Sequence, residues 1–404
     1  MTTNNIPQGY KDSPLGIIPE EWEVKKLREI AEINPTRKDF ISPFVTFLSM
    51  ADISEHGGIL KENIIPQNSI KPGLTSFKRG DIIIAKITPC FENGKGALLN
   101  NITNEYGFGS TEFHVIRCKQ CNLFIYYHTM SYAFRKRLES QMTGSAGQKR
   151  VPADSISSYK IPVPPLSEQQ KIAEVLSTWD KAIEKQSRLI EKLELRKKGL
   201  MQQLLTGKKR LPGFSCEWKT MKLGELFDER NETNMPALPL LSITANKGII
   251  LQTESEKKNT SNDDKSKYKR ICPNDIGYNT MRMWQGRCAL SKLEGIVSPA
   301  YTIIIPHNNI NPYYMEMLFK QPFMVYRFWT HSQGLVNDTL NCKFPSFSQV
   351  KVIIPDLKEQ NAIIEILLSC DTEITLANQR FESLRQQKKG LMQVLLTGKN
   401  RVIR

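Results

Sequence analysis

Two stretches of this sequence are copies of each other. Residues 164–210 read PPLSEQQKIAEVLSTWDKAIEKQSRLIEKLELRKKGLMQQLLTGKKR, and residues 355–401 read PDLKEQNAIIEILLSCDTEITLANQRFESLRQQKKGLMQVLLTGKNR. They align without gaps at a shift of 191 positions, and about half of the aligned residues are identical. A match of this length indicates that the chain consists of two halves built on one frame.

Both copies carry the signals of a long helix. Prolines precede each copy, and the residues at 167–170 and 356–359 predict capping boxes at the helix starts. Both copies end at Thr-Gly, where glycine supplies the left-handed residue that stops a helix. Between these ends apolar residues recur at spacings of four and three, which is a heptad seam. The seam residues are Ile172, Leu176, Trp179, Ile183, Ile190, Leu193 and Leu200 in the first copy, and Ile363, Leu367, Ile374, Phe381, Leu384 and Leu391 in the second.

The length and the narrow seam of these helices predict a coiled coil. At 1.5 Å per residue each helix would be a rod of roughly 57 Å. A seam on each of two copies predicts that they pack on each other antiparallel, which would relate the halves by a pseudo-twofold axis. Polar or small residues interrupt the seam at Gln186, Lys197, Cys370 and Ala377. The alternative is two separate amphipathic helices that each cover their own domain.

The segments outside the repeats predict two globular domains. A shorter echo opens each half, where Trp22 and Leu27 have the same spacing as Trp218 and Leu223. β-type runs and a helical segment then follow in the same order, at 45–48, 81–87, 113–117 and 124–140 in the first half and at 240–244, 301–305 and 312–329 in the second. We therefore predict an α+β (mixed α/β) fold in four segments: an N-terminal domain at 1–160, a central helix at 161–210, a C-terminal domain at 211–354 and a distal helix at 355–404.

The composition favours a polyanionic partner. Lysine and arginine number 56 against 41 acidic residues, a formal net charge of +15, and such an excess is typical of nucleic-acid-binding proteins. A generally basic surface that only aids solubility is the alternative. Because no apolar run approaches the roughly 18 residues of a membrane span and residues 1–13 are too polar for a signal peptide, we expect a cytoplasmic protein without a membrane partner.

The motifs of common catalytic and metal sites are missing from the sequence. There is no phosphate-binding loop, dinucleotide-binding glycine motif, nucleophile elbow or zinc-protease motif. The sequence NPYY at 311–314 resembles the base-holding NPPY box of adenine methyltransferases, but it lacks the second proline and is interpreted as the start of a helix. The eight cysteines are expected to be reduced, and Cys118 and Cys121 lack the further ligands of a zinc site. We therefore expect no catalytic residue, metal or cofactor in this chain.

Loops rich in basic and amide side chains are the candidate DNA contacts. Lysine and arginine contact phosphates, arginine pairs with guanine, asparagine and glutamine pair with adenine, and glycines allow close backbone approach. In the first half these residues are Lys78, Arg79, Lys86, Asn93, Lys95, Gln148, Lys149 and Arg150. In the second half they are Asn246, Lys247, Arg282, Gln285, Arg287, Ser332 and Gln333. For any single residue a solvated loop side chain is the simpler interpretation, so the prediction rests on the two sets together.

The order of these features resembles the specificity subunit of type I restriction-modification systems. The matching motifs are IIPEEW at 17–22 with Leu27, the run at 160–176, and KGLMQ followed by LLTG at 198–207. The last two recur near 351–367 and 389–398. The likeness covers the whole chain, and its motifs are specific when taken together.

The resemblance implies a function that spacing alone does not. In that family each variable domain is a target recognition domain that reads one half of a split, asymmetric DNA site, and the coiled coil sets the gap and docks two adenine methyltransferase subunits. Two restriction/translocase subunits join them for cleavage, in defence against foreign DNA. This chain would then be non-catalytic, and S-adenosylmethionine, ATP and Mg2+ would belong to its partners. The second seam departs from the leucine-rich family pattern at Cys370 and Ala377, which weakens only the packing argument.

The sequence is also compatible with two other functions. The first is a coiled-coil scaffold whose basic domains bind proteins or RNA without DNA sequence specificity, and a salt-sensitive but sequence-indifferent gel shift would favour it. The second is a self-sufficient methyltransferase or nuclease, which the missing motifs disfavour. Methyl transfer by the purified chain alone would favour this second function.

Overall fold

The computed structural model describes residues 6–36, 42–145, 147–244, 247–255, 262–335 and 339–402. Contacts divide the chain into two compact units: unit 1 is Met1–Ser187 with Gln379–Arg404, and unit 2 is Arg188–Asn378. Two long helices, α5 (Leu166–Leu204) and α9 (Leu357–Leu395), each contribute one part to either unit. The four predicted segments thus follow chain order, whereas packing assigns part of both helices to each domain.

Unit 1 contains two four-stranded sheets packed on each other. The central sheet has the order β4 (Ala31–Ile33), β11 (Phe113–Cys118), β8 (Ile82–Ala85) and β9 (Gly96–Leu98), and all its pairs are antiparallel. The second sheet has the order β6 (Asn63–Pro66), β5 (Phe44–Leu48), β10 (Tyr106–Gly109) and β7 (Thr75–Lys78), and β10 is parallel to β5. Because side chains alternate along a strand, Ile82 and Ile84 pack on the helical side and Ile83 packs towards the second sheet.

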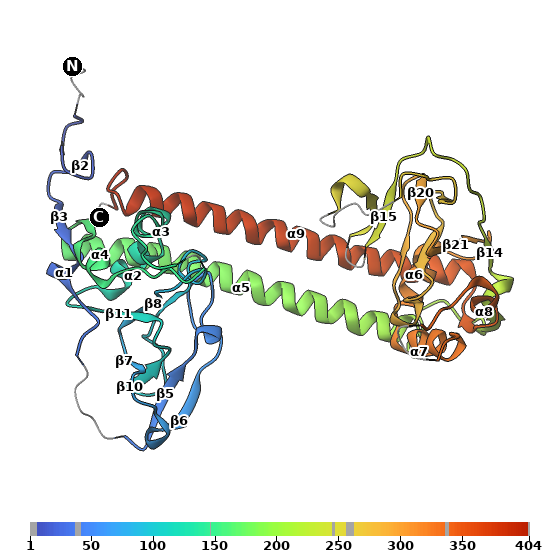
Figure 1. Ribbon diagram of the computed structural model, residues 1–404, viewed down its shortest axis with the longest axis horizontal. Helices are drawn as coiled ribbons and strands as arrows, with labels where there is room; N and C mark the ends of the chain where they lie inside the picture. Colours follow the sequence, from blue (N-terminus) through green and yellow to red (C-terminus); the bar gives the residue numbers. More distant parts are fainter. Residues whose placement is uncertain are drawn as a thin grey trace. The chain divides into compact units, whose positions relative to one another are not determined.

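Helices cover the other face of the central sheet (Figure 1). They are α1 (Leu27–Ile30), α2 (Asn122–Met130), α3 (Tyr132–Glu139) and α4 (Ala153–Ser158). A small antiparallel pair of β3 (Glu23–Lys26) and β12 (Lys160–Val163) leads into α5, and β1 (Tyr10–Lys11) pairs with β2 (Ile18–Pro19). Leu176 of α5 and Leu395 of α9 belong to the same buried core as Trp22 and Phe124, so the ends of the long helices are part of this domain.

Unit 2 repeats this plan with a smaller second layer. Its central antiparallel sheet has the order β14 (Phe227–Glu229), β21 (Tyr301–Pro306), β18 (Ile276–Asn279) and β19 (Cys288–Leu290). Three two-stranded pairs surround it: β15 (Leu241–Thr244) with β16 (Gly248–Leu251), β17 (Lys269–Ile271) with β20 (Gly295–Val297), and β13 (Lys219–Lys222) with β22 (Lys351–Ile354). The helices are α6 (Pro312–Phe319), α7 (Pro322–His331) and α8 (Phe344–Ser348). The predicted mixed α/β class is therefore confirmed in both halves.

The helical segment predicted in each domain is two helices rather than one. In unit 1 the break falls at Ser131, whose hydroxyl accepts a hydrogen bond from Phe134 N and caps α3. In unit 2 Pro322 occupies the first turn of α7, where its missing amide costs no hydrogen bond. Both signals are local, and the apolar residues on either side of them continue the pattern of one helix.

The starts of α5 and α9 differ from the predicted capping boxes. Helix α5 begins at Leu166, so Ser167 lies inside the helix, and the Gln169 side chain donates to Pro164 O at 2.9 Å instead. In α9 Gln360 makes the same bond to Pro355 O, and Asp356 accepts from Glu359 N at 2.9 Å, as an N-cap does. Gly207 and Gly398 follow the helices with φ of 69° and 74°, which is the left-handed conformation predicted for them.

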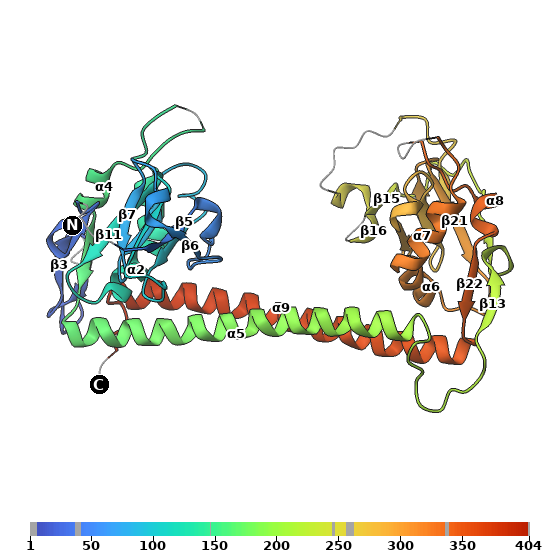
Figure 2. The same ribbon diagram turned by 90° about the horizontal axis from the view of Figure 1, so that it is seen from below.

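Helices α5 and α9 run antiparallel in each unit (Figures 1 and 2). Lys388 Nζ lies 2.5 Å from Asp180 Oδ1 in unit 1, and Lys197 Nζ lies 2.5 Å from Asp371 Oδ1 in unit 2. Each residue of one pair is 191 positions from its counterpart in the other. The seam residues named from the sequence are buried or half-buried, as are Gln186, Cys370 and Ala377. Among the described helices, none is long and apolar enough to cross a membrane.

Candidate nucleic-acid interface

The candidate residues of unit 1 lie at the two ends of strand β8. Lys86 directly follows the strand, and Asn93 and Lys95 belong to the loop that connects β8 to β9. The loop between α3 and α4 joins them there, because Val151 N donates to Lys86 O and Thr88 N donates to Lys149 O, both at 3.0 Å. This loop carries Gln148–Arg150 and extends away from α5 and α9 (Figure 2). Lys78 and Arg79 lie at the opposite end, where β7 ends at Lys78 and Arg79 begins the turn to β8.

Most of the basic groups at the carboxyl end of β8 are held by the protein itself. Lys86 Nζ donates to Thr111 O at 2.8 Å, and burial lowers the pKa of this ammonium. The Arg150 guanidinium binds both carboxylate oxygens of Glu112 at 2.8–3.1 Å and lowers the pKa of that carboxyl. Lys95 Nζ donates to a backbone carbonyl at 2.9 Å. The side chains of Gln148 and Lys149 are exposed and have no such contact within the described residues.

Asn93 and Arg79, two other predicted residues of unit 1, also have intramolecular partners. Asn93 donates to Glu55 at 3.0 Å. Gly94, beside it, has a φ of 84°, and a Cβ there would lie 2.7 Å from Glu55 O, so the loop needs glycine at this position. Arg79 donates to the carbonyls of Ile102 and Thr103 at 3.2 and 2.8 Å. Arg79 thus links the turn before β8 to the β9–β10 loop, and the structure does not bring it together with Lys86.

A residue missed by sequence reasoning organises the β8–β9 loop. Arg135 of α3 is only 7% exposed, and its guanidinium lies 4.7 Å from the centre of the Phe91 ring. It donates to Thr129 O at 2.8 Å, to Phe91 O at 3.1 Å and to Gly94 O at 3.4 Å. Burial lowers its pKa to about 10. The sequence does not indicate that Arg135 is buried, because a basic residue in a polar helix is normally solvated.

Most of the candidate residues of unit 2 lie at the carboxyl end of β18. Arg282, Gln285 and Arg287 lie in the β18–β19 loop, which contains the short 3₁₀ helix η5 (Met283–Gln285). The chain that leaves α7 lies beside this loop, since Cys342 N donates to Thr280 O at 2.8 Å. Ser332 and Gln333 belong to that chain: Ser332 Oγ donates to Phe328 O, and the backbone of Gln333 pairs with Asn341.

The arginines of this second loop differ from those of unit 1. The side chains of Arg282 and Arg287 make no hydrogen bond or ion pair with any described residue, and Arg287 is exposed. Gly286 stands between the loop and α7 with a φ of 69°, and a Cβ there would lie 3.1 Å from Val325 Cγ2. The guanidinium groups therefore remain available to a ligand. Lys247 lies at the turn between β15 and β16, and Asn246 lies outside the described residues.

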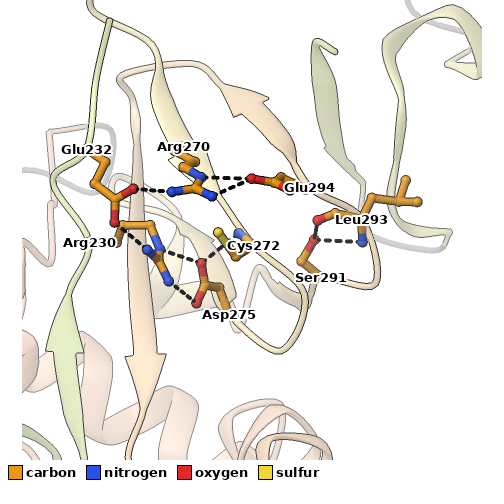
Figure 3. Close-up of polar contacts among 8 residues, drawn as sticks. All are labelled: Arg230, Glu232, Arg270, Cys272, Asp275, Ser291, Leu293 and Glu294. Atoms are coloured by element: carbon orange, nitrogen blue, oxygen red, sulfur yellow. Dashed lines mark hydrogen bonds and ion pairs between the residues drawn. The ribbon is translucent and has the colours of Figure 1, made fainter. Parts of the chain in front are cut away.

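The opposite end of β18 is closed by a chain of ion pairs (Figure 3). Buried Asp275 accepts two hydrogen bonds from Arg230 at 2.7 and 3.1 Å and one from Cys272 N. Arg230 and Arg270 both bind Glu232, and Arg270 also binds Glu294. In unit 1, Asp81 at the start of β8 accepts two bonds from Arg117 at 2.8 and 2.9 Å. One end of the central strand is thus fixed by a similar ion pair in both halves, and the other end differs.

Each long helix also starts at a repeated polar contact. Glu168 of α5 accepts from Trp22 Nε1 at 3.0 Å and from Arg401 at 2.9 and 3.2 Å. Glu359 of α9 accepts from Trp218 Nε1 at 3.1 Å and from Arg210 at 2.6 Å. In each unit the arginine that follows one helix therefore binds the glutamate that begins the other.

The described part of the chain contains no group of three or more His, Cys, Asp or Glu residues that could hold a metal ion. Cys118 and Cys121 are free, and burial raises the pKa of the Cys118 thiol to about 12. Burial also lowers the pKa of His114 to about 4 and that of His128 to about 3. Both imidazoles are therefore neutral at pH 7, and both belong to the packed interior of unit 1.

Comparison with known proteins finds relatives along the whole chain. The chain is similar to the type I restriction enzyme MjaX specificity subunit, a putative assignment in Methanocaldococcus jannaschii, at 26% identity over 98% of this chain and 97% of the relative. The EcoAI specificity subunit of Escherichia coli is 43% identical over 38% of this chain and 27% of its own length. The chain thus matches about a quarter of the length of the Escherichia coli relatives.

The fold is also found in a solved structure of a type I restriction-modification system. One chain of that structure superposes with a TM-score of 0.63 at 18% identity, and the match covers 95% of this chain and 99% of the other. The family described as the type I restriction modification DNA specificity domain matches residues 19–195 and 216–386, one match in each half of the chain. Since these two matches cover most of its length, the protein belongs to the type I restriction-modification DNA specificity family.

Proposed function

We propose that this chain is the DNA sequence-recognition subunit of a type I restriction-modification enzyme, and that each domain binds one half of an asymmetric, bipartite DNA site. The observation that carries the proposal is the combination of a repeated frame with unequal loops. The ends of β8 and β18 that bear Asp81 and Asp275 are closed in a similar way. The opposite ends carry different sets of basic and amide residues, so two different half-sequences would be read.

The loops of the two domains would contribute in different ways. In unit 2, Arg282 and Arg287 have no intramolecular partner among the described residues and can donate to phosphates or to guanine. In unit 1, Gln148 and Lys149 are the exposed side chains, while Arg150 and Lys86 support the loop. The net charge of +15 would add affinity that falls steeply with salt concentration.

The long helices would set the distance between the half-sites. Half-sites read from one side of B-DNA lie about one turn, roughly 34 Å, apart. Helices α5 and α9 are continuous over 39 residues each, which corresponds to about 58 Å of helix. A stiff pair of that length would fix one gap, and a duplex with a base pair added to the gap would bind poorly.

The contacts that occur in both units would form two equivalent surfaces for partner subunits. Two identical methyltransferase subunits need two equivalent surfaces, and the contacts at Glu168 and Glu359 and at Asp180 and Asp371 occur once in each unit. Two restriction/translocase subunits would complete the enzyme. S-adenosylmethionine, ATP and Mg2+ would bind to these partners, which would carry out the catalysis.

A selection experiment tests this function. The chain, assembled with the methyltransferase subunits of a type I system, is used to enrich bound duplexes from a randomised library at 150 mM salt. We expect one bipartite motif with a fixed gap, and binding that drops when one base pair is added to the gap. Binding that is sensitive to salt but indifferent to sequence would contradict the proposal and favour a scaffold.

A further inference from the structure

Helix α7 presents two large aromatic side chains on the surface of unit 2. Tyr326 is 63% exposed and Trp329 is 46% exposed, and their ring centres lie 5.8 Å apart at an interplanar angle of 33°. The opposite face of the helix is buried through Met324 and Phe328. Two exposed aromatic rings in contact are unusual for a solvated helix face, because burial of such rings is strongly favourable.

The other half of the molecule provides an internal comparison. Helix α3 corresponds to α7 at a shift of 190 positions, since its buried Phe134 and Leu138 fall on Met324 and Phe328. At this shift Tyr326 and Trp329 replace Lys136 and Glu139, which form an exposed ion pair at 3.2 Å. The aromatic pair is therefore specific to unit 2. Two identical partner subunits would require a surface that both halves share, so this surface does not fit them.

The surroundings of the aromatic pair are basic. Helix α7 packs against η5. The two come so close at Gly286 that a Cβ atom there would lie 3.1 Å from Val325 Cγ2. Arg282 and Arg287 flank this contact without an ion-pair partner among the described residues. Residues 322–331 include Arg327 and His331 but no aspartate or glutamate. Exposed aromatic rings beside unpaired arginines are the combination with which proteins bind nucleic acids.

We infer that Tyr326 and Trp329 form part of the DNA-binding surface of unit 2, where their rings contact the bases or sugars of the half-site while Arg282 and Arg287 contact phosphates or base edges. This inference rests on the proposed function and adds a helix face to the loops named from the sequence. An apolar ring against a base or sugar adds affinity that does not depend on salt, unlike the arginine contacts. The half-site of unit 2 would thus be bound by a different chemistry from that of unit 1.

A transplant of the α3 pair tests the inference. The assembled complex that carries Tyr326→Lys with Trp329→Glu is compared with the unaltered complex by equilibrium binding to the bipartite duplex and to two duplexes that each have one half-site scrambled. We expect at least about tenfold weaker binding to the intact duplex. We expect no further loss on the duplex that lacks the half-site of unit 2. The new pair occupies positions where α3 tolerates it, and circular dichroism with methyltransferase association confirms that the variant is folded.

Two further variants complete the test. Trp329→Phe keeps an aromatic ring and should bind within about threefold of the unaltered complex. Tyr132→Ser removes an equally exposed aromatic side chain from α3, and it should leave the half-site of unit 2 unaffected. If the unaltered complex does not prefer the bipartite duplex, the proposed function and this inference are both wrong. If it has that preference and the transplant keeps full affinity, or loses only methyltransferase association, the inference alone is overturned.

Discussion

The arginines of the two recognition domains differ in what their guanidinium groups touch. In unit 1, Arg150 binds the Glu112 carboxylate and Arg79 binds backbone carbonyls of the β9–β10 loop. In unit 2, the side chains of Arg282 and Arg287 have no hydrogen-bond or ion-pair partner within the described residues. A guanidinium that is already bidentate to a carboxylate must break those bonds before it can bind a base, which costs binding energy. The direct readout by arginine is therefore expected in unit 2.

Arg287→Ala tests this expectation. Loss of one base contact costs about 1–3 kcal/mol, so we expect roughly 5- to 150-fold weaker binding to the cognate duplex and relaxed specificity at one position of one half-site. The measurement is equilibrium binding to duplexes with single substitutions in each half. Lys292→Ala is the matched control, because it removes the same charge from the opposite end of β19. Equal weakening at unrelated sequences would instead identify Arg287 as a phosphate contact.

His128 predicts how the stability of unit 1 depends on pH. Its Nε2 atom is buried without a hydrogen bond, and burial lowers its pKa from 6.5 to about 3. The unfolded chain therefore takes up a proton first as the pH falls, so this residue costs stability below about pH 6.5 and down to about pH 3. At pH 5 the cost relative to pH 8 is about 2 kcal/mol.

Replacement of His128 by leucine removes this cost. We expect His128→Leu to raise the free energy of unfolding at pH 5 more than at pH 8, because the new side chain is apolar and of similar volume. Urea unfolding at the two pH values measures the difference. The exposed His331→Gln is the control and should change neither value. An equal effect of His128→Leu at both pH values would show that burial does not lower the pKa of this imidazole.

Residue types at the interface could be predicted from the sequence, but their roles could not. Basic and amide residues beside glycines indicated the loops at the carboxyl ends of β8 and β18. Whether a given arginine is free depends on a carboxylate far away in the chain, as Glu112 is from Arg150. The buried Arg135 and the paired rings of Tyr326 and Trp329 gave no signal either, because burial and ring contact are properties of the packed domain.

At the scale of elements, the same polar contact holds the first turn of both long helices. Glu359 is 1% exposed and binds both Arg210 and Trp218, so its removal leaves a partly buried guanidinium without its carboxylate. Loss of the carboxylate is therefore expected to destabilise this helix start. The same contact at Glu168 involves Arg401 and Trp22.

Glu359→Gln and Glu168→Gln form a matched pair of tests. We expect Glu359→Gln to increase amide hydrogen exchange in the first turns of α9 and the last turns of α5, with little change at the start of α5. Glu168→Gln should give the mirrored result, at the start of α5 and the end of α9. Hydrogen exchange with mass spectrometry resolves these segments. Uniform destabilisation of both helix starts by either variant would contradict a local role.

The elements themselves were largely predictable. The heptad spacing and the terminal Thr-Gly gave both helices to within a few residues, because these signals are local. The splits at Ser131 and Pro322 were missed, since apolar residues continue the helical pattern on both sides. The start of α5 differed because the helix begins at Leu166, one residue before the predicted cap Ser167, and the Gln169 side chain donates to Pro164 O instead of completing a capping box.

At the scale of the whole molecule, the chain repeats a frame and varies its loops. The repeat was visible at once from residues 164–210 and 355–401. The assignment of half of each helix to each unit was not, because it depends on packing between segments that lie about 190 residues apart. A frame that occurs twice suits two equivalent partners, and loops that differ suit an asymmetric DNA site.

A map of N6-methyladenine across the source genome, with and without this gene, tests the central claim most directly. The account predicts that deletion removes methylation from a single motif made of two different half-sequences separated by a fixed gap, and that restoring the gene restores it. Loss of a continuous or palindromic motif, or a methylation pattern that does not change while the gene is expressed, would contradict it.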